Sequence, residues 1–301
     1  MGDASELGGQ SSRPDAASVR EALLRDGFAR IPGVLDAAMV AAVDRAAHAR
    51  LANTPPEHFA ANRTTGSMLD IVGDPTFDAL VAHPSVIDLL ERLGFGHEIV
   101  FSAGYVISKP SQAPRLFWHQ DWLYWDDPVS HVSTPHQLFA MYYLVDTTRA
   151  NGCLRVIPGS HRRQLPAHEF LLRAHSPDAL SGAELSHPTF GDLPGEIDVP
   201  VRAGDLLLGD SRLLHAAHAN HGAERRTLIT LWYHPAYEQL PAAIRASIQQ
   251  LADQNGRALR CLAPALRAGH EPARESSEAA PLNREPRFPG IPGAVLPAGR
   301  A

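Results

Sequence analysis

The sequence predicts a mainly β protein, a sandwich or barrel of strands with helices at both ends. Segments rich in Val, Ile, Tyr and Phe follow one another between residues 98 and 235, separated by turns that contain Pro, Gly, Asn or Asp. Apolar residues recur at helical spacing on both sides of that run, within residues 17–95 and 239–262. In such folds the helices cover one sheet, and the ends of the strands form a pocket.

One domain, residues 15–264, is expected to account for most of the chain. The 301 residues are 44% hydrophobic, which is enough for one large core. Residues 1–14 are rich in Gly, Ser and Asp and hold no apolar run, so we expect a disordered leader there. Residues 265–301 are rich in Pro, Gly and Arg, and this tail is expected to lack structure.

Two residues mark expected helix boundaries in the region before the β core. Asp36 is expected to cap a helix, because its carboxylate can accept from an orphan N–H of the first turn. Pro84 is expected to interrupt the next helical stretch. The expected elements are a helix from residue 17, an extended piece 27–35, a helix 36–51, a loop 53–66 and a helical stretch 75–93.

One segment of the β core, residues 137–146, is apolar on both faces. Phe139, Met141 and Tyr143 share one face, and the residues between them share the other. Such a strand belongs in a sheet interior between two layers. The other expected strands are 99–102, 105–108, the segment around His119, 153–157, 196–200, 206–208 and 226–234.

Composition excludes several classes of function. The formal net charge is -6 and no long basic run occurs, so neither nucleic acid nor an anionic membrane is an expected partner. No apolar run is long enough to span a bilayer. The two cysteines form neither a disulfide framework nor a CxxC motif, which favours a reducing, cytoplasmic location.

The stretch from Phe117 to Trp125 holds three of the four tryptophans around a His-x-Asp. In a β-strand, side chains at i and i+2 leave on the same face, which would align His119 with Asp121 and turn Gln120 to the reverse face. A further histidine would complete a 2-His-1-carboxylate set, which holds Fe(II) and leaves other positions open. The tripeptide alone is not specific, because it often occurs by chance.

His215, at the end of an apolar strand, is the preferred third ligand. Arg226 follows it across a short loop, and an antiparallel return would place its guanidinium beside His215, where it could grip the far carboxylate of an oxo-acid. The alternative interpretation is a hydrogen-bonded core histidine and a surface arginine. Of the other candidates, His218 and His221 fall in the loop.

Several motifs in this order resemble the phytanoyl-CoA dioxygenase-like (PhyH-type) branch of the iron(II)/2-oxoglutarate-dependent oxygenases. The resemblance runs from about residue 26 to 235 and implies a double-stranded β-helix, a jelly roll of the cupin-like kind. The segments that carry it are 26–35, 118–121, 151–161, 203–205 and the series His215, Asn220, Arg226.

The resemblance also implies roles for single residues. His119, Asp121 and His215 match the iron ligands, and Arg226 matches the residue that pairs with the distal carboxylate of 2-oxoglutarate. The positions that line the co-substrate site in relatives are Gln120, Tyr105 and Met141.

The reaction that this family performs becomes the expectation for this chain. It would use Fe(II), 2-oxoglutarate and O2, form succinate and CO2, and hydroxylate an unactivated C–H bond of a small metabolite or natural product. No catalytic side chain beyond the metal centre is expected, because the iron carries the chemistry. Trp122, Tyr124 and Trp125 are expected to roof the substrate site, unless these aromatics pack the sheet against its helices.

Two other classes of function stay open. A cupin-like metalloenzyme that does not use 2-oxoglutarate would keep the three metal ligands but would not need Arg226. A non-catalytic member would bind a ligand without turnover. The sequence leaves open the substrate, the outcome (hydroxylation, desaturation, cyclisation or oxidative deamination) and the oligomeric state.

Overall fold

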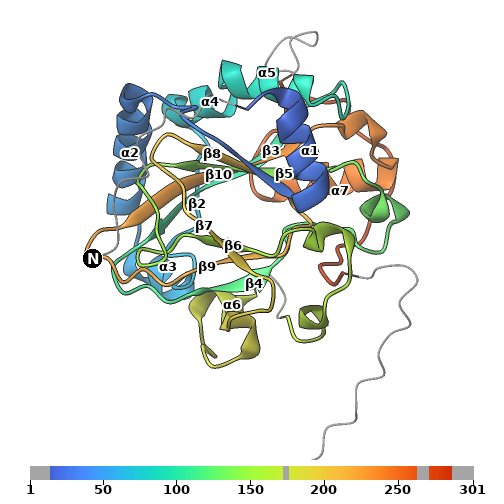
Figure 1. Ribbon diagram of the computed structural model, residues 1–301. Coiled ribbons are helices and arrows are strands. Elements are labelled where there is room, and N and C mark those ends of the chain that lie inside the picture. Colours follow the sequence, from blue (N-terminus) through green and yellow to red (C-terminus); the bar gives the residue numbers. More distant parts are fainter. Residues whose placement is uncertain (1–13, 172–175, 263–270, 287–301) are drawn as a thin grey trace, which may run out of the picture.

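The computed structural model describes residues 14–171, 176–262 and 271–286. Within these residues two antiparallel sheets are stacked, with a helical layer on the outer side of the larger sheet (Figure 1). The leader expected at residues 1–14 falls almost wholly outside the described part of the chain. Residues 265–270 and 287–301 of the expected tail fall outside it as well.

The two sheets differ in size and in the order of their strands. The larger sheet runs β1 (Phe28–Ile31), β8 (Leu206–Asp210), β5 (Leu138–Tyr143), β10 (Arg226–His234), β3 (Val100–Lys109) and β11 (Arg260–Cys261), with β2 (Leu69–Asp70) also paired to β3. The smaller sheet runs β4 (Leu116–His119), β9 (His215–Ala217), β6 (Leu154–Val156) and β7 (Ile197–Val199). Neighbours in each sheet are mostly distant in sequence, as in a jelly roll.

Helices cover the outer face of the larger sheet through one continuous hydrophobic core. Asp36 caps α2 as expected, since its Oδ1 accepts from the Met39 N–H at 2.7 Å. Pro84 begins α5 directly after α4 ends, which confirms the expected interruption. The helices are α1 (Ala16–Asp26), α2 (Ala37–Ala52), α3 (Pro56–Ala61), α4 (Pro75–Val81), α5 (Pro84–Arg92), α6 (Pro177–Ser181) and α7 (Ala242–Gln254). None in the described part of the chain has the length and apolar character needed to cross a membrane.

Strand β5 lies inside the larger sheet, between β8 and β10. Its residues Leu138, Ala140 and Tyr142 join the core beneath the helices. Phe139 and Met141 point the other way and join the core between the two sheets. The alternation predicted from the sequence is therefore confirmed, and one face of β5 is directed at the space where a ligand could bind.

Some elements differ from the expectation. The predicted loop 53–66 contains the short helix α3, and the two expected strands 99–102 and 105–108 form one strand, β3. Gly104 in the middle of β3 allows the Ile71 side chain to approach closely, because a Cβ at this position would lie 2.5 Å from it. The helix expected to reach residue 262 ends at Gln254, and Gly256 follows in the left-handed conformation.

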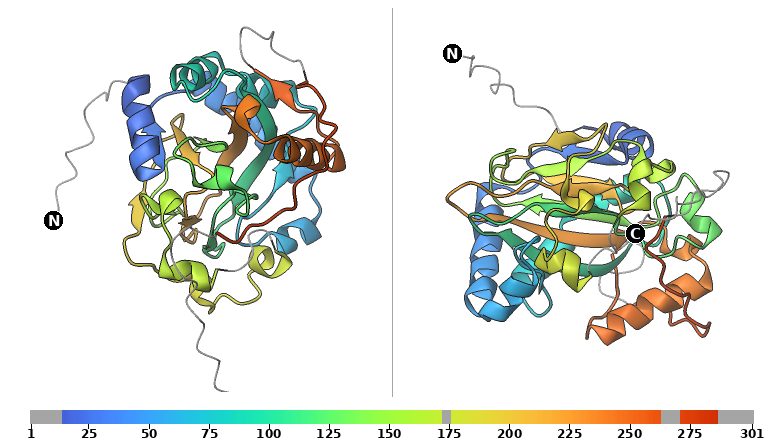
Figure 2. Two further views of the ribbon diagram at one scale, coloured as in Figure 1. Left: turned by 90° about the vertical axis from the view of Figure 1, so that its right-hand side faces the viewer. Right: turned by 90° about the horizontal axis from the view of Figure 1, so that it is seen from below.

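The expectation that the tail lacks structure is wrong for residues 271–286. This segment lies beside α7 (Figure 2), where the Ala280 N–H donates to Ala243 O at 2.9 Å. Asn283 forms a parallel bridge with Tyr124, and its N–H donates to Leu123 O at 2.6 Å. Side chains add to these backbone bonds, because Arg274 and Glu275 form ion pairs with Asp253 and Arg245 of α7.

Candidate metal centre

His119 and His215 stand side by side on neighbouring strands of the smaller sheet. His119 ends β4 and His215 begins β9, and the antiparallel register pairs the two residues directly. Their ring centroids lie 4.1 Å apart, and both side chains are buried. The pairing of β4 with β9 therefore brings together two imidazoles that are far apart in the sequence.

Asp121 joins the two histidines from just beyond the end of β4. Its Oδ1 lies 3.6 Å from His119 Nε2, and its Oδ2 lies 3.9 Å from His215 Nε2. The expected strand through residues 119–121 is wrong, because β4 ends at His119 and the Asp121 N–H donates to Ser211 O at 2.8 Å. The carboxylate nevertheless meets both imidazoles, as the motif predicted.

Backbone carbonyls hold both imidazoles in one tautomer. His119 Nδ1 lies 3.0 Å from Phe117 O, and His215 Nδ1 lies 3.0 Å from Leu213 O. Because a carbonyl oxygen only accepts, each Nδ1 carries the proton, and in the neutral ring each Nε2 carries a lone pair. One ligand atom from each of the three residues lies within 4.8 Å of the others, so this group could hold a metal ion. Its composition fits the facial set that binds non-heme Fe(II).

The Trp232 indole orients the carboxylate of this group. Its Nε1–H donates to Asp121 Oδ2 at 3.0 Å, from β10 of the opposite sheet. Hydrogen bonds of this kind fix the direction of a ligating carboxylate and tune its affinity for a metal. Trp232 was not among the residues predicted for the site.

Arg226 lines a cavity of about 60 Å³ together with His119, Asp121 and His215. The expected antiparallel return from His215 to Arg226 is wrong, because β9 and β10 belong to different sheets and the loop between them crosses the sandwich. The two residues nevertheless line the same cavity. The sequence thus predicted the association correctly, but by an incorrect path of the chain.

Arg226 is a buried cation, only 4% exposed. Among the described residues no carboxylate forms an ion pair with it, and its Nε has no acceptor. Burial lowers the pKa of the guanidinium, yet an arginine remains protonated at neutral pH. A buried charge without a partner is costly, so this geometry favours an anionic ligand in the cavity.

A second buried cation, Lys109, pairs with Arg226 in the register of β3 and β10. Its Nζ donates to His218 O at 3.0 Å. Burial, and then the charge of Arg226, lower the pKa of Lys109 well below its usual value. Lys109 therefore loses its proton more readily than Arg226. The Arg226 guanidinium remains as the permanent positive charge of the two.

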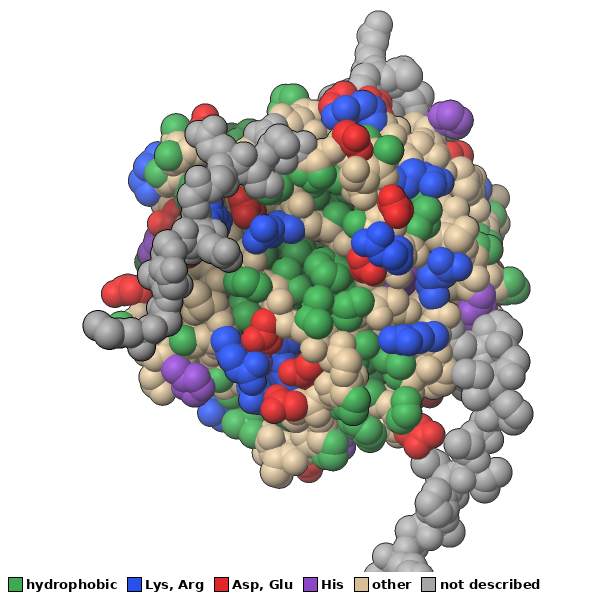
Figure 3. Space-filling model, in the orientation of Figure 1, with side chains coloured by type: hydrophobic (Ala, Val, Ile, Leu, Met, Phe, Trp, Pro, Cys, Tyr) green, Lys and Arg blue, Asp and Glu red, His purple; other side chains and the backbone are tan. Residues whose placement is uncertain are grey.

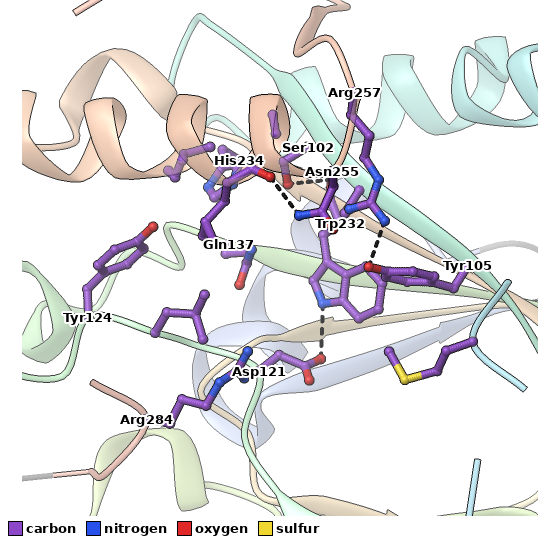
Figure 4. A pocket seen from close by; sticks show the side chains of 16 residues that line it. Ser102, Tyr105, Asp121, Tyr124, Gln137, Trp232, His234, Asn255, Arg257 and Arg284 are labelled. Carbon is purple, nitrogen blue, oxygen red and sulfur yellow. Dashed lines mark hydrogen bonds between the residues drawn. The ribbon is translucent and has the colours of Figure 1, made fainter. Parts of the chain in front are cut away.

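A larger cavity, about 260 Å³ (Figure 4), shares lining residues with the smaller one. Met68, Asp121 and Trp232 line both cavities, so they form the boundary between them. The remaining walls come from β3, β10, α7, the loop after α7, the segment 271–286 and three residues between β4 and β5: Leu123, Tyr124 and Gln137. A second ligand in the larger cavity would therefore lie next to the Asp121 carboxylate.

The three residues predicted to line the co-substrate site take different places. Met141 lines the smaller cavity with Arg226, as expected. Tyr105 lines the larger cavity instead, where its hydroxyl accepts from Arg257 at 2.6 Å. Among the described residues that line the two cavities, Gln120 does not occur. Its amide donates to Arg212 O instead.

The three aromatics predicted to roof the substrate site pack against α7. Trp122, Tyr124 and Trp125 all belong to one hydrophobic cluster with that helix. Trp122 and Trp125 are 1% exposed and do not line the larger cavity, so the packing interpretation describes them. Only Tyr124 also lines that cavity, with its hydroxyl donating to Ser247 Oγ at 3.2 Å.

Period-two spacing along β10 could have revealed part of what sequence reasoning missed. Starting from Arg226, every second residue lines one of the two cavities: Leu228, Thr230, Trp232 and His234. Arg257 and Arg284 had no comparable signal, because they come from a loop and a tail whose positions depend on α7.

A second group, Cys153, Asp198 and His218, also has ligand-type atoms within 4.8 Å of one another. His218 Nε2 lies 2.6 Å from Asp198 Oδ1, and Arg149 bridges to the same carboxylate at 3.1 Å. Burial, and then Asp198, raise the pKa of the Cys153 thiol to about 11. A protonated thiol and a carboxylate that already has two partners are typical of a structural ion pair.

A double-stranded β-helix with a facing 2-His-1-carboxylate group defines a class of metal-dependent oxygenases. The family model for phytanoyl-CoA dioxygenase (PhyH) matches residues 23–228, more than half of the chain, and the chain belongs to this family. The predicted membership of the PhyH-type branch of the iron(II)/2-oxoglutarate-dependent oxygenases is therefore confirmed.

Curated relatives match part of the chain at low identity. A protein of Stutzerimonas stutzeri named as a probable alpha-ketoglutarate-dependent hypophosphite dioxygenase is 27% identical over 180 residues, 57% of this chain and 59% of its own. The L-proline trans-4-hydroxylase of Streptomyces griseoviridis is 25% identical over 167 residues, 51% of this chain and 61% of its own. The chain therefore spans less than two thirds of the length of these relatives.

Solved structures share the fold over a larger part of the chain. The non-heme alpha ketoglutarate dependent epimerase SnoN from nogalamycin biosynthesis has a TM-score of 0.56 at 23% identity, covering 89% of this chain and 97% of its own. HygX from Streptomyces hygroscopicus, with nickel and 2-oxoglutarate bound, has a TM-score of 0.54 at 20% identity, covering 72% and 86%. The predicted jelly-roll fold is thereby confirmed.

Proposed function

We propose that this chain is an oxygenase dependent on Fe(II) and 2-oxoglutarate, which hydroxylates an unactivated C–H bond of a small metabolite or natural product and forms succinate and CO2. One observation carries the proposal. A buried guanidinium, Arg226, shares a cavity with His119, Asp121 and His215. A dicarboxylate that binds the metal through its oxo-acid end would need such a cation for its other carboxylate.

Each residue of the centre has a separate task in this proposal. His119, Asp121 and His215 would hold the iron, and the bound iron would supply the activation of oxygen. The carbonyls behind both imidazoles and the Trp232 indole keep the ligand atoms aimed at one point. Arg226 would bind the co-substrate, and apolar residues of both sheets exclude water: Leu154, Ala217 and Leu228.

The proposed substrate is a small molecule and neither a nucleic acid nor a membrane lipid. The net charge of -6 and the mixture of both charge signs on the face shown in Figure 3 support this choice. A cytoplasmic location is part of the proposal, supported by Cys153 and Cys261, which are buried free thiols.

Succinate formation from 2-oxoglutarate, measured with Fe(II) and oxygen, tests the proposal. We expect Arg226→Ala to raise the KM for 2-oxoglutarate about 10- to 100-fold, as expected from the loss of hydrogen bonds to a charged group. Arg225→Ala is the matched control. This neighbouring arginine is outside the cavity, where it donates to Ser108 O at 2.9 Å, so its KM should stay within about twofold.

The same assay separates the alternatives. Wild-type protein that forms no succinate under any condition, even slowly and without substrate, would favour a non-catalytic ligand-binding protein. Equal KM values for 2-oxoglutarate in the Arg226 and Arg225 variants would contradict the role of Arg226. Metal-dependent turnover that needs no 2-oxoglutarate would indicate a cupin-like enzyme of another kind.

A further inference from the structure

The larger cavity contains polar atoms that the described chain does not satisfy. His234 Nε2 and Gln137 Oε1 are buried, and neither has a hydrogen-bond partner. The hydroxyl groups of the same wall all have protein partners: Ser102 with Trp232 O, Tyr105 with Arg257, and Tyr124 with Ser247. Buried polar atoms are almost always paired in folded proteins, so these two acceptors on one cavity are suited to a ligand that donates hydrogen bonds.

His234 holds an unpaired hydrogen-bond acceptor in the wall of this cavity. It is the last residue of β10 and is fully buried. Its Nδ1 lies 2.9 Å from His136 O, and because a carbonyl only accepts, Nδ1 carries the proton and Nε2 the lone pair. Burial lowers the pKa of His234 to about 4, so the ring is neutral at physiological pH. A partner for Nε2 must therefore donate a hydrogen bond.

Gln137 lies next to His234 across the sheet. It immediately precedes β5, whose first residue, Leu138, pairs with Tyr233 of β10. Its amide points into the cavity, between His234 and Asp121 in the view of Figure 4. The buried Oε1 is a second acceptor, directed at the space next to the metal group.

We propose that His234 and Gln137 are the specificity-determining residues of the substrate site. They would accept hydrogen bonds from neighbouring hydroxyl or amine groups of a small polyol, amino alcohol or amine. Ile248 and Leu251 of α7, on the same cavity, would contact its carbon skeleton. This proposal rests on the proposed function, because it takes the larger cavity as the substrate site of the oxygenase.

Polar buried groups discriminate strongly, because a substrate without the matching donor leaves them unpaired. The first test is a panel of polyols and amino alcohols, each with a counterpart in which every hydroxyl is O-methylated and every amine is trimethylated, measured for stimulation of 2-oxoglutarate consumption. We expect the unmethylated compounds to stimulate at least tenfold more than their counterparts, and Gln137→Met to raise their KM at least tenfold. Equal stimulation by both forms would overturn the proposal.

A stability measurement tests whether the Gln137 amide serves a ligand or the fold, even if no compound of the panel is a substrate. Gln137→Met removes a buried amide whose oxygen has no protein partner, so the Tm of the ligand-free protein should be unchanged or higher. Gln249→Met is the matched control, because that buried amide donates to Ala273 O at 2.8 Å and accepts from the Glu275 N–H at 2.9 Å. Its Tm should fall.

A fall in Tm for Gln137→Met as large as that for Gln249→Met would overturn the proposal, since the Gln137 amide would then serve the fold. The two proposals fail in different ways. Failure of the proposed function appears as wild-type protein that forms no succinate with Fe(II) and 2-oxoglutarate. Failure of this inference leaves succinate formation intact, but removes the preference for donors or the contrast in Tm.

Discussion

The two cavities that share Asp121 and Trp232 are built in different ways. The smaller cavity is lined mainly by strands of the two stacked sheets, which carry the proposed metal-binding group and Arg226. The larger cavity takes much of its wall from α7, from the loop with Arg257 and from the segment 271–286 with Arg284, all outside the sheets. Regular strand pairing thus places the groups of the proposed chemistry, and added elements shape the space for a second ligand.

This difference predicts which measurements each cavity controls. Substitutions in the smaller cavity should act on the metal and on 2-oxoglutarate, whereas changes in the larger cavity should act on substrate and local stability. Met68, Asp121 and Trp232 are the exceptions, because they line both cavities.

Loss of a ligand in the smaller cavity should have the largest effect. We expect His215→Ala to bind no iron and to lower succinate formation at least about 10³-fold, because two remaining ligands hold a divalent ion poorly. Iron content and succinate are the measurements. His221→Ala, a substitution of an exposed histidine in the following loop, should keep both at wild-type values. Full iron content in the His215 variant would refute the ligand assignment.

Acid should destabilise the protein through a residue of the larger cavity. Burial lowers the pKa of His234 from 6.5 to about 4. The unfolded chain therefore binds more protons between these values, so the stabilising contribution is complete above pH 6.5 and is lost as pH falls through about 4. The difference amounts to roughly 3 kcal/mol for this group.

Urea unfolding between pH 7 and 4.5, with a chelator present, measures this dependence. His234→Phe should lose a larger part of the pH dependence than any single substitution of an exposed histidine. An identical pH profile in the variant and the wild type would show that His234 is not the titrating group.

A substitution of Trp232, at the boundary between the two cavities, should have an intermediate effect on metal affinity. Trp232→Phe keeps the ring but removes the hydrogen bond to Asp121, and we expect metal affinity to fall about 10- to 100-fold. Anaerobic titration with Fe(II) is the measurement. In the control, Trp122→Phe, the lost bond is to Ser130 Oγ at 2.7 Å and does not involve a proposed metal ligand. Unless the two variants differ in metal affinity, the orienting role of Trp232 is wrong.

Removing the segment 271–286 from the wall of the larger cavity should have the smallest effect. Truncation after residue 270 removes Asn283, whose carbonyl accepts from the Trp125 N–H at 3.3 Å. We expect amide exchange at Trp125 to become about tenfold faster, since one backbone hydrogen bond contributes on the order of 1 kcal/mol. Metal affinity should not change. A large loss of metal affinity would show that the two cavities are not built independently.

The local pattern of the chain determined much of the fold and of the metal-binding group. The two buried faces of β5 could be predicted because side chains alternate between the faces of a strand and here are apolar on both. His119, Asp121, His215 and Arg226 could be named because metal and carboxylate chemistry restricts the residue types that serve it.

Only the tertiary structure decided how these pieces meet. Whether an aromatic lines a pocket or packs on a helix depends on which element covers it, and α7 covers Trp122 and Trp125. The segment 271–286 is held by main-chain hydrogen bonds and by ion pairs of Arg274 and Glu275 with α7, whose partners only the fold brings together. Arg226 reaches the metal group from the opposite sheet. Spacing along a chain restricts local geometry, but the packing of layers sets which distant faces share a cavity.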